Sequence, residues 1–287
     1  MFRSSLLTAV LSLTTLFAST QEIKEPKTTA EWTAAYQPFR IAGNLYYVGT
    51  YDLGCYLITT SQGNILINTG LAASLDQIKS NIETLGFKFS DIKILLTTQA
   101  HYDHMGAMAE IKKQTGAQLM VNEKEADVLV SGGQSDYELG VYGTSFKPVK
   151  PDRLLKDGDT IKLDGMQLVI LNHPGHTKGS SSYSFTVKDE KRSWKVLIAN
   201  MPTIVTDKAF KDISSYPEIA KDYAYTFQAM KNISFDIWVA SHASQFKLHT
   251  KHKPGDTYDP AAFIDQPGYD SALNDLQKQY ERKIAEQ

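Results

Sequence analysis

Hydrophobic residues in the first part of the chain follow strand-like spacing and then helix-like spacing. Three short β-rich runs come first, at 45–48, 55–60 and 64–68. Turn residues such as Gly54 separate them, which is typical of neighbouring antiparallel strands. Apolar residues between 75 and 85 then recur at helical spacing and stop at Gly86. The pattern therefore predicts an antiparallel start to a sheet, followed by a helix.

A continuous apolar run at 92–96 has the length of a buried strand and leads directly into a polar segment. Three further elements are expected after it: a helix from about His104 to Gln114 closed by Gly116, a strand over 118–121 and a short helix over 123–130. The stretch 131–143 is rich in Gly and Tyr, which is typical of a loop that borders a cleft.

The second half repeats this plan. The expected elements are strands near 160–162, 167–171, 181–185 and 195–198, a helix over about 216–231, a strand over 237–240 and an amphipathic helix over 269–287. The mixture of strands and helices predicts the α/β class. We expect one domain over residues 21–287, with two sheets packed between helices.

The N-terminus carries one positive side chain, a short apolar stretch and then small residues. Leu6 to Ala18 is too short to span a membrane as a helix. Residues 1–20 are therefore interpreted as a signal peptide, which predicts a periplasmic protein with no membrane anchor.

Composition excludes several classes of protein. A hydrophobic fraction of 42% is sufficient for a sizeable core, which argues against disorder. The 30 basic and 32 acidic residues give a net charge of −2, so no basic face for nucleic acid is indicated. Small-molecule chemistry is favoured, and we expect a monomer. Cys55 is the only cysteine and is interpreted as a small buried residue, since no intrachain disulfide can form.

Potential metal ligands cluster directly after the apolar run at 92–96. They are Gln99, His101, Asp103 and His104, with His176 and His242 following later at expected strand ends. Zinc prefers nitrogen, sulfur or carboxylate donors, and a catalytic zinc keeps one position open for water. A tight loop after a strand is able to turn such side chains toward one point. Six donors are sufficient for two ions, so the pattern predicts a two-zinc hydrolase site.

The other histidines fit a metal site less well. His173 precedes His176 in a Pro-Gly turn and is interpreted as a structural or supporting residue. His249 and His252 lie in a basic stretch that is expected to be solvated.

These motifs resemble those of the metallo-β-lactamase superfamily, whose usual loop reads His-x-His-x-Asp-His. This chain has Gln99 in place of the first His, a departure that resembles the glutamine-bearing GOB group of subclass B3. The resemblance runs from about Glu25 to the C-terminal helix. It implies the αββα sandwich of that family.

The resemblance also implies the roles of the donors. One zinc would bind Gln99, His101 and His176, and the other would bind Asp103, His104 and His242. A neutral carboxamide is a poorer zinc donor than imidazole, so one or two ions are both possible. The implied reaction is hydrolysis of the β-lactam amide of penicillins, cephalosporins and carbapenems by a zinc-activated hydroxide, which confers antibiotic resistance. Asp103 would be the catalytic residue.

The remaining candidates are residues that would contact the substrate. Many subclass B3 relatives carry serines where this chain has Met201 and Thr203; the candidate contacts are Thr203, Lys178 and Tyr142. A glyoxalase II-like thioesterase or a lactonase is an alternative, but those relatives typically carry a bridging carboxylate after a later strand, and the corresponding stretch 199–201 contains no acid. A secreted zinc-binding protein without catalysis is a second alternative, which predicts a closed coordination shell.

Overall fold

The computed structural model describes residues 22–286, so the predicted signal peptide at 1–20 lies outside the described residues. Within residues 22–286 the strands form two sheets. The first sheet has the order β1 (Phe39–Ala42), β2 (Leu45–Tyr47), β3 (Tyr56–Thr60), β4 (Gly63–Ile67), β5 (Ile92–Leu96), β6 (Gln118–Asn122) and β7 (Arg153–Leu155). The second has the order β12 (Ile237–Ala240), β11 (Ser193–Ala199), β10 (Ser181–Lys188), β9 (Met166–Asn172) and β8 (Thr160–Leu163).

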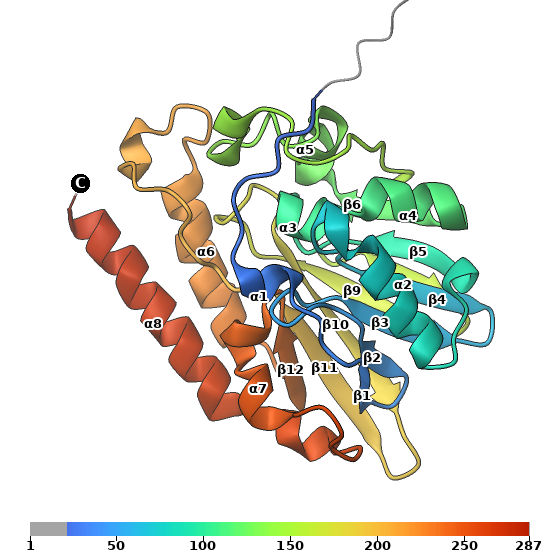
Figure 1. Ribbon diagram of the computed structural model, residues 1–287. Helices are drawn as coiled ribbons and strands as arrows, with labels where there is room; N and C mark the ends of the chain where they lie inside the picture. The colour runs from blue at the N-terminus through green and yellow to red at the C-terminus, as the bar shows by residue number, and fades with distance from the viewer. Residues whose placement is uncertain (1–21, 287) are drawn as a thin grey trace, which may run out of the picture.

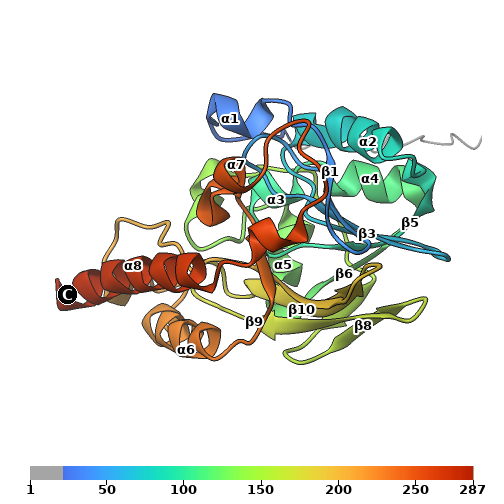
Figure 2. The same cartoon turned by 90° about the horizontal axis from the view of Figure 1, so that it is seen from below.

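Helices cover the outer faces of the two sheets (Figures 1 and 2). The α-helices of the described region are α1 (Ala30–Thr33), α2 (Leu75–Thr84), α3 (Tyr102–Met105), α4 (Met108–Thr115), α5 (Ala126–Ser131), α6 (Ile219–Lys231), α7 (Leu248–Lys251) and α8 (Gln266–Ala285). Figure 2 shows α2 and α4 on one side of the pair of sheets and α6 on the other. No helix among residues 22–286 is long and apolar enough to cross a membrane.

Strand alternation explains how the layers pack. In β4, Ile65 and Ile67 belong to the core between the sheets, whereas Leu66 belongs to the core under α2 and α4. In the neighbouring strand, Leu95 lies beside Leu66 and joins the same helix-side core. Side chains alternate between faces along a strand, so a sheet covered on both sides has two apolar faces. The expected αββα sandwich is confirmed.

Three strands of the second sheet end at the same edge of that sheet, and each leads to a predicted site residue. Strand β10 is antiparallel to both β9 and β11, and β11 is parallel to β12. The chain therefore leaves β9, β11 and β12 at the same end of the second sheet. Those exits lead to His176, Thr203 and His242, respectively.

Most elements predicted from periodicity are present, and β5 and β12 have the predicted bounds. The antiparallel pairing of β2, β3 and β4 is also confirmed. The helix expected over 104–114 is wrong as a single element, because α3 and α4 are separate. Gly106 lies at the break and donates its backbone N–H to Gly70 O at 2.8 Å. A Cβ there would collide with the backbone of Leu71 and Ala72.

Two short strands and one buried histidine differ from what the sequence predicts. Strands β1 and β7 have only four and three residues, too few for a periodic signal. His252 is buried and stacks on Phe39, with ring centroids 3.6 Å apart. The prediction that His252 is solvated is therefore wrong. Cys55 is fully buried, as expected, and burial raises the pKa of its thiol.

Candidate metal centre and substrate cavity

The loop after β5 is held by hydrogen bonds from neighbouring segments. Asn68 has a positive φ of 62° and accepts from Thr98 N through its Oδ1 at 2.9 Å. The buried Glu125 accepts from Ala100 N and Gly179 N, each at 2.6 Å. Glu125 therefore ties the loop carrying His101 to the loop carrying His176.

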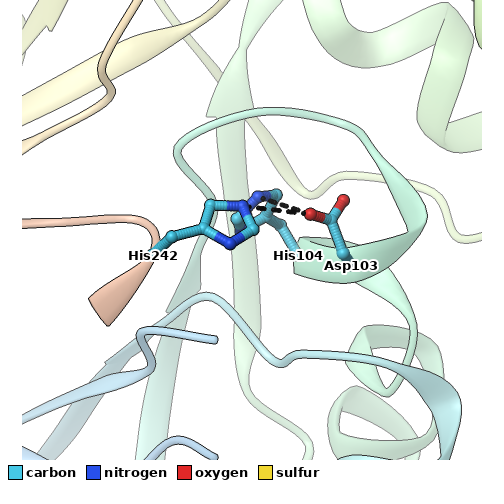
Figure 3. A group of neighbouring side chains, drawn as sticks. All are labelled: Asp103, His104 and His242. Atoms are coloured by element: carbon cyan, nitrogen blue, oxygen red, sulfur yellow. Dashed lines mark ion pairs between the residues drawn. The ribbon is translucent and has the colours of Figure 1, made fainter. Parts of the chain in front are cut away.

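Asp103, His104 and His242 form a compact cluster. Their donor atoms all lie within 4.8 Å of one another. Asp103 Oδ2 lies 3.2 Å from His104 Nε2 and 3.3 Å from His242 Nε2. Figure 3 shows the three side chains pointing toward one another, two from the start of α3 and one from the loop after β12.

The charges of this cluster favour a cation. Burial opposes ionisation of Asp103, yet His104 and His242 hold the pKa of its carboxyl well below the usual range. Burial likewise opposes protonation of His242, yet Asp103 and Asp52 raise its pKa to about 9. Two carboxylates thus stabilise positive charge at His242. A divalent cation satisfies the same negative field.

His101 and His176 lie together beside this cluster, and Gln99 lines the same cavity as they do. His176 Nε2 is 3.2 Å from His101 Nδ1. The other ring nitrogens face outer partners: His176 Nδ1 lies 2.9 Å from Thr203 O, and His101 Nε2 lies 3.4 Å from Asp136 Oδ2. Burial lowers the pKa of His176 to about 3, which keeps its imidazole neutral and able to bind a metal.

The residues present fit zinc. Gln99 Oε1 and the cluster-facing Nε2 of His104 are buried and form no hydrogen bond within residues 22–286. Such atoms destabilise a fold unless something satisfies them. The two sets offer imidazole, carboxylate and carboxamide donors, and the first two are the usual non-sulfur ligands of zinc.

Both donor sets open into one cavity of about 750 Å³. Five of the six predicted ligands line it; His104 lies behind them, fully buried in the cluster. The remaining lining residues are Pro26, Lys27, Trp32, Asp52, Tyr102, Leu139, Tyr142, Thr203, Val205, Ser244 and Gln245. The cavity is large enough for a small bicyclic molecule.

The candidate substrate residues are placed differently from one another. Thr203 and Tyr142 line the cavity, and the Thr203 hydroxyl lies 2.9 Å from His176 Nδ1. Lys178 does not line it; its ammonium lies 5.6 Å from the Tyr216 ring centroid. His173 is also outside the lining and lies 2.7 Å from Ser182 Oγ through Nδ1.

Several lining residues carry no site signal in the sequence, among them Lys27, Trp32 and Asp52. Lys27 and Trp32 precede the first strand, where no motif marks them as site residues. Asp52 lies in the turn segment between β2 and β3. Its only sequence signal is a carboxylate between Gly49 and Gly54, which is as typical of an ordinary surface turn.

Comparisons with known proteins identify the family of this chain. The model of the metallo-β-lactamase superfamily matches residues 55–190. A crystal structure of the metallo-β-lactamase GOB-18 from Elizabethkingia meningoseptica is 59% identical, with 94% of this chain and 100% of that chain covered and a TM-score of 0.93. The class B3 di-zinc metallo-β-lactamase LRA-12 from an Alaskan soil metagenome is 66% identical, with coverages of 91% and 100% and a TM-score of 0.90.

More distant curated relatives match over shorter segments. Hydroxyacylglutathione hydrolase GloC of Haemophilus influenzae is 30% identical over 148 residues, which is 50% of this chain. The match spans 65% of the length of that relative. The full-length structural matches decide the assignment, because they combine high identity with complete coverage. This chain belongs to the metallo-β-lactamase superfamily, and subclass B3 metallo-β-lactamases are among its most similar relatives.

Proposed function

We propose that this protein is a zinc-dependent β-lactamase that hydrolyses the β-lactam amide of penicillins, cephalosporins and carbapenems and thereby confers antibiotic resistance. The observation that carries the proposal is the meeting of two zinc-type donor sets at the wall of one cavity. The similarity to GOB-18 and LRA-12 supports the choice of substrate class.

The two donor sets would hold two ions. Gln99, His101 and His176 form one proposed set, and Asp103, His104 and His242 form the other. When bound, zinc is a Lewis acid that lowers the pKa of water and stabilises negative charge on the carbonyl oxygen. The set that contains Gln99 is the weaker one, because a carboxamide oxygen carries no formal charge and is a poorer donor than imidazole.

Asp103 is the proposed catalytic residue. Its position between two histidines leaves an acceptor carboxylate at the cavity wall. It orients the attacking water and helps to pass the proton of that water to the departing ring nitrogen. As the amide bond breaks, the carbonyl carbon gains the water oxygen and the nitrogen leaves as an amine. Ring strain reduces the need for a stronger general acid.

Substrate orientation requires a partner for the substrate carboxylate. Met201 is buried and apolar, and the Thr203 hydroxyl already lies beside His176. Among the described residues that line the cavity, Lys27 is the one lysine or arginine. We assign the carboxylate contact to Lys27 together with Thr203, and a packing contact to the half-exposed Tyr142. Lys178 is the alternative cation.

Steady-state kinetics distinguish Lys27 from Lys178 as the residue that contacts the substrate carboxylate. Lys27→Ala is expected to raise the KM for a carboxylate-bearing cephalosporin by up to about fivefold with little change in kcat, since Lys27 is exposed and an exposed ion pair contributes at most about 1 kcal/mol. Lys24→Ala is the matched control, because Lys24 lies on the same segment but outside the cavity lining. If Lys178→Ala raises the KM and Lys27→Ala does not, Lys178 is the residue that contacts the substrate carboxylate.

The proposal also includes the cellular location and the oligomeric state. Residues 1–20 are proposed to be a signal peptide that directs the chain to the periplasm, where the mature domain over 21–287 acts as a monomer. N-terminal sequencing of protein released by osmotic shock, followed by sedimentation analysis, tests both statements.

The activity is tested with the purified mature chain. A chromogenic cephalosporin and a carbapenem are assayed with and without a zinc chelator, and the metal content is measured in parallel. Turnover abolished by chelation and restored by zinc is the expected result. His101→Gln should lose activity, whereas His249→Gln should keep it, because His249 lies outside the cavity.

The same assay separates the rival hydrolases. The match to a hydroxyacylglutathione hydrolase makes a glutathione thioester the appropriate competitor substrate. Thioester or lactone hydrolysis without β-lactam hydrolysis by the folded, zinc-loaded chain would overturn the proposal. Zinc binding without turnover of any of these substrates would favour a metal-capture protein.

A further inference from the structure

Asp52 connects the metal centre to the N-terminal segment. Its Oδ2 lies 3.1 Å from His242 Nδ1 and accepts from Trp32 Nε1 at 3.2 Å. Its Oδ1 accepts from Ser244 N at 2.8 Å. The backbone of the same residue accepts from Ala243 N. One side chain therefore contacts both the loop after β12 and helix α1.

These contacts fix both the tautomer and the direction of the His242 ring. A carboxylate accepts hydrogen bonds, so Asp52 holds a proton on Nδ1 of His242. The lone pair of a neutral imidazole is then on Nε2, the atom that lies 3.3 Å from Asp103 Oδ2. Carboxylates that accept from the second nitrogen of a metal-binding histidine usually strengthen metal binding.

Trp32 contacts both Asp52 and the ring of His242. Its indole ring lies 5.3 Å from the His242 ring, centroid to centroid, and its N–H occupies the same carboxylate oxygen as His242. Besides the indole hydrogen bond, backbone hydrogen bonds from Asp52 N to Glu31 O at 3.2 Å and from Tyr51 N to Ala34 O at 2.8 Å hold helix α1 against the segment that carries Asp52. The indole hydrogen bond therefore acts on the ligand through Asp52.

We propose that Asp52 is a positioning residue for His242 and that Trp32 holds Asp52, so that the N-terminal segment sets the metal affinity of the Asp103, His104 and His242 cluster. This inference rests on the proposed ligand role of His242. The set of Gln99, His101 and His176 has different outer partners, Asp136 and Thr203, and is expected to keep its affinity.

Zinc binding to the mature chain tests the inference without any substrate. Zinc affinities are measured by competition with a chromophoric chelator, and cobalt spectra report the geometry of each site. Asp52→Ala is expected to weaken one of the two sites by about 10–100-fold, the effect usual for loss of such an outer partner. Trp32→Phe keeps an aromatic ring but removes the N–H, and is expected to weaken the same site by a smaller factor.

Asp164→Asn is the matched control. Asp164 also accepts from a backbone N–H and a hydroxyl, both of Ser61, but it is outside the cavity lining. If Asp52→Ala does not fold, as judged by near-UV circular dichroism, Asp52→Asn and Trp32→Phe carry the test. Weakening of one site in the Asp52 and Trp32 variants, with Asp164→Asn unchanged, supports the inference.

Wild-type affinity at both sites in folded Asp52→Asn and Trp32→Phe would overturn the inference. Equal weakening of both sites would also overturn it, because that result indicates a general loss of structure. The proposed activity fails separately, when the wild-type chain binds zinc but hydrolyses no β-lactam. Zinc binding by the wild-type chain that is no tighter than that of Asp103→Asn would overturn both.

Discussion

Gln99 places a carboxamide oxygen, buried and without a hydrogen-bond partner in the described region, at the wall of the cavity. Gln99→His should bind zinc more tightly at this set, by about tenfold or 1.4 kcal/mol, because imidazole is the better zinc donor. Gln99→Ala should bind more weakly. Zinc titration of the three proteins checks the order, and an affinity of Gln99→Ala equal to wild type would remove Gln99 from the ligand set.

His173 gives a pH dependence that does not involve a proposed metal ligand. Burial lowers its pKa to about 3, against about 6.5 for an unfolded chain. As the pH falls from about 6.5 toward 3, the unfolded state binds a proton that the native state does not. The native state therefore loses stability over that window, at a slope approaching 1.4 kcal/mol per pH unit.

The variant His173→Gln isolates this effect, because glutamine retains a polar group near Ser182 without titrating. The free energy of unfolding is measured with a denaturant between pH 7 and pH 4, in the presence of a chelator. We expect the variant to be less stable than wild type at pH 7 and the difference to shrink as the pH falls. Parallel pH profiles would contradict the assignment.

At the scale of elements, Gly106 separates α3 from α4 where the chain passes close to Gly70 and Leu71. Gly106→Ala should lower the free energy of unfolding by about 1–3 kcal/mol through overpacking and should also weaken zinc binding, because the collision lies two residues from His104. Gly116→Ala is the control: its φ is 68° with open space around it, so only stability should fall. Denaturant unfolding and zinc titration measure the two effects.

The segment from β5 to Gly116 was predicted from the sequence only in part. The apolar run of β5 and the turn glycine at 116 were visible locally, so a strand and a helix end were predicted there. The break at Gly106 depends on the backbone of residues 70–72, more than 30 positions away, and no local pattern contains it. The six proposed ligands were predicted from their residue types and spacing. Trp32 and Asp52 could not be predicted in this way, because their connection to the site is the hydrogen bond of Trp32 to Asp52 and the contact of Asp52 with His242, which is 190 positions away.

At the scale of the whole molecule, the proposed ligands come from both sheets: the loop after β5 in the first sheet, and the loops after β9 and β12 in the second. Bound zinc should therefore stabilise the packing of the sheets against each other. A ligand that binds only the folded state at 100 times its Kd contributes about 2.7 kcal/mol.

Removal of zinc is accordingly expected to lower the Tm by about 5–10 °C for a domain of this size. Differential scanning calorimetry with and without a chelator measures the change. Asp103→Asn should show a much smaller shift, since it lacks the charged ligand. An unchanged Tm on chelation would show that the sheets pack without help from the metal.

The contact of Trp32 with Asp52, and of Asp52 with His242, also has a consequence for synthesis. A ribosome adds His242 a full 210 residues after Trp32, which takes roughly 10–40 s at 5–20 residues per second. During that interval the nascent chain lacks His242, the last histidine of the cluster. The chain therefore completes its Asp103, His104 and His242 cluster only after residue 242 has been translated, so premature capture of an ion in this cluster is disfavoured.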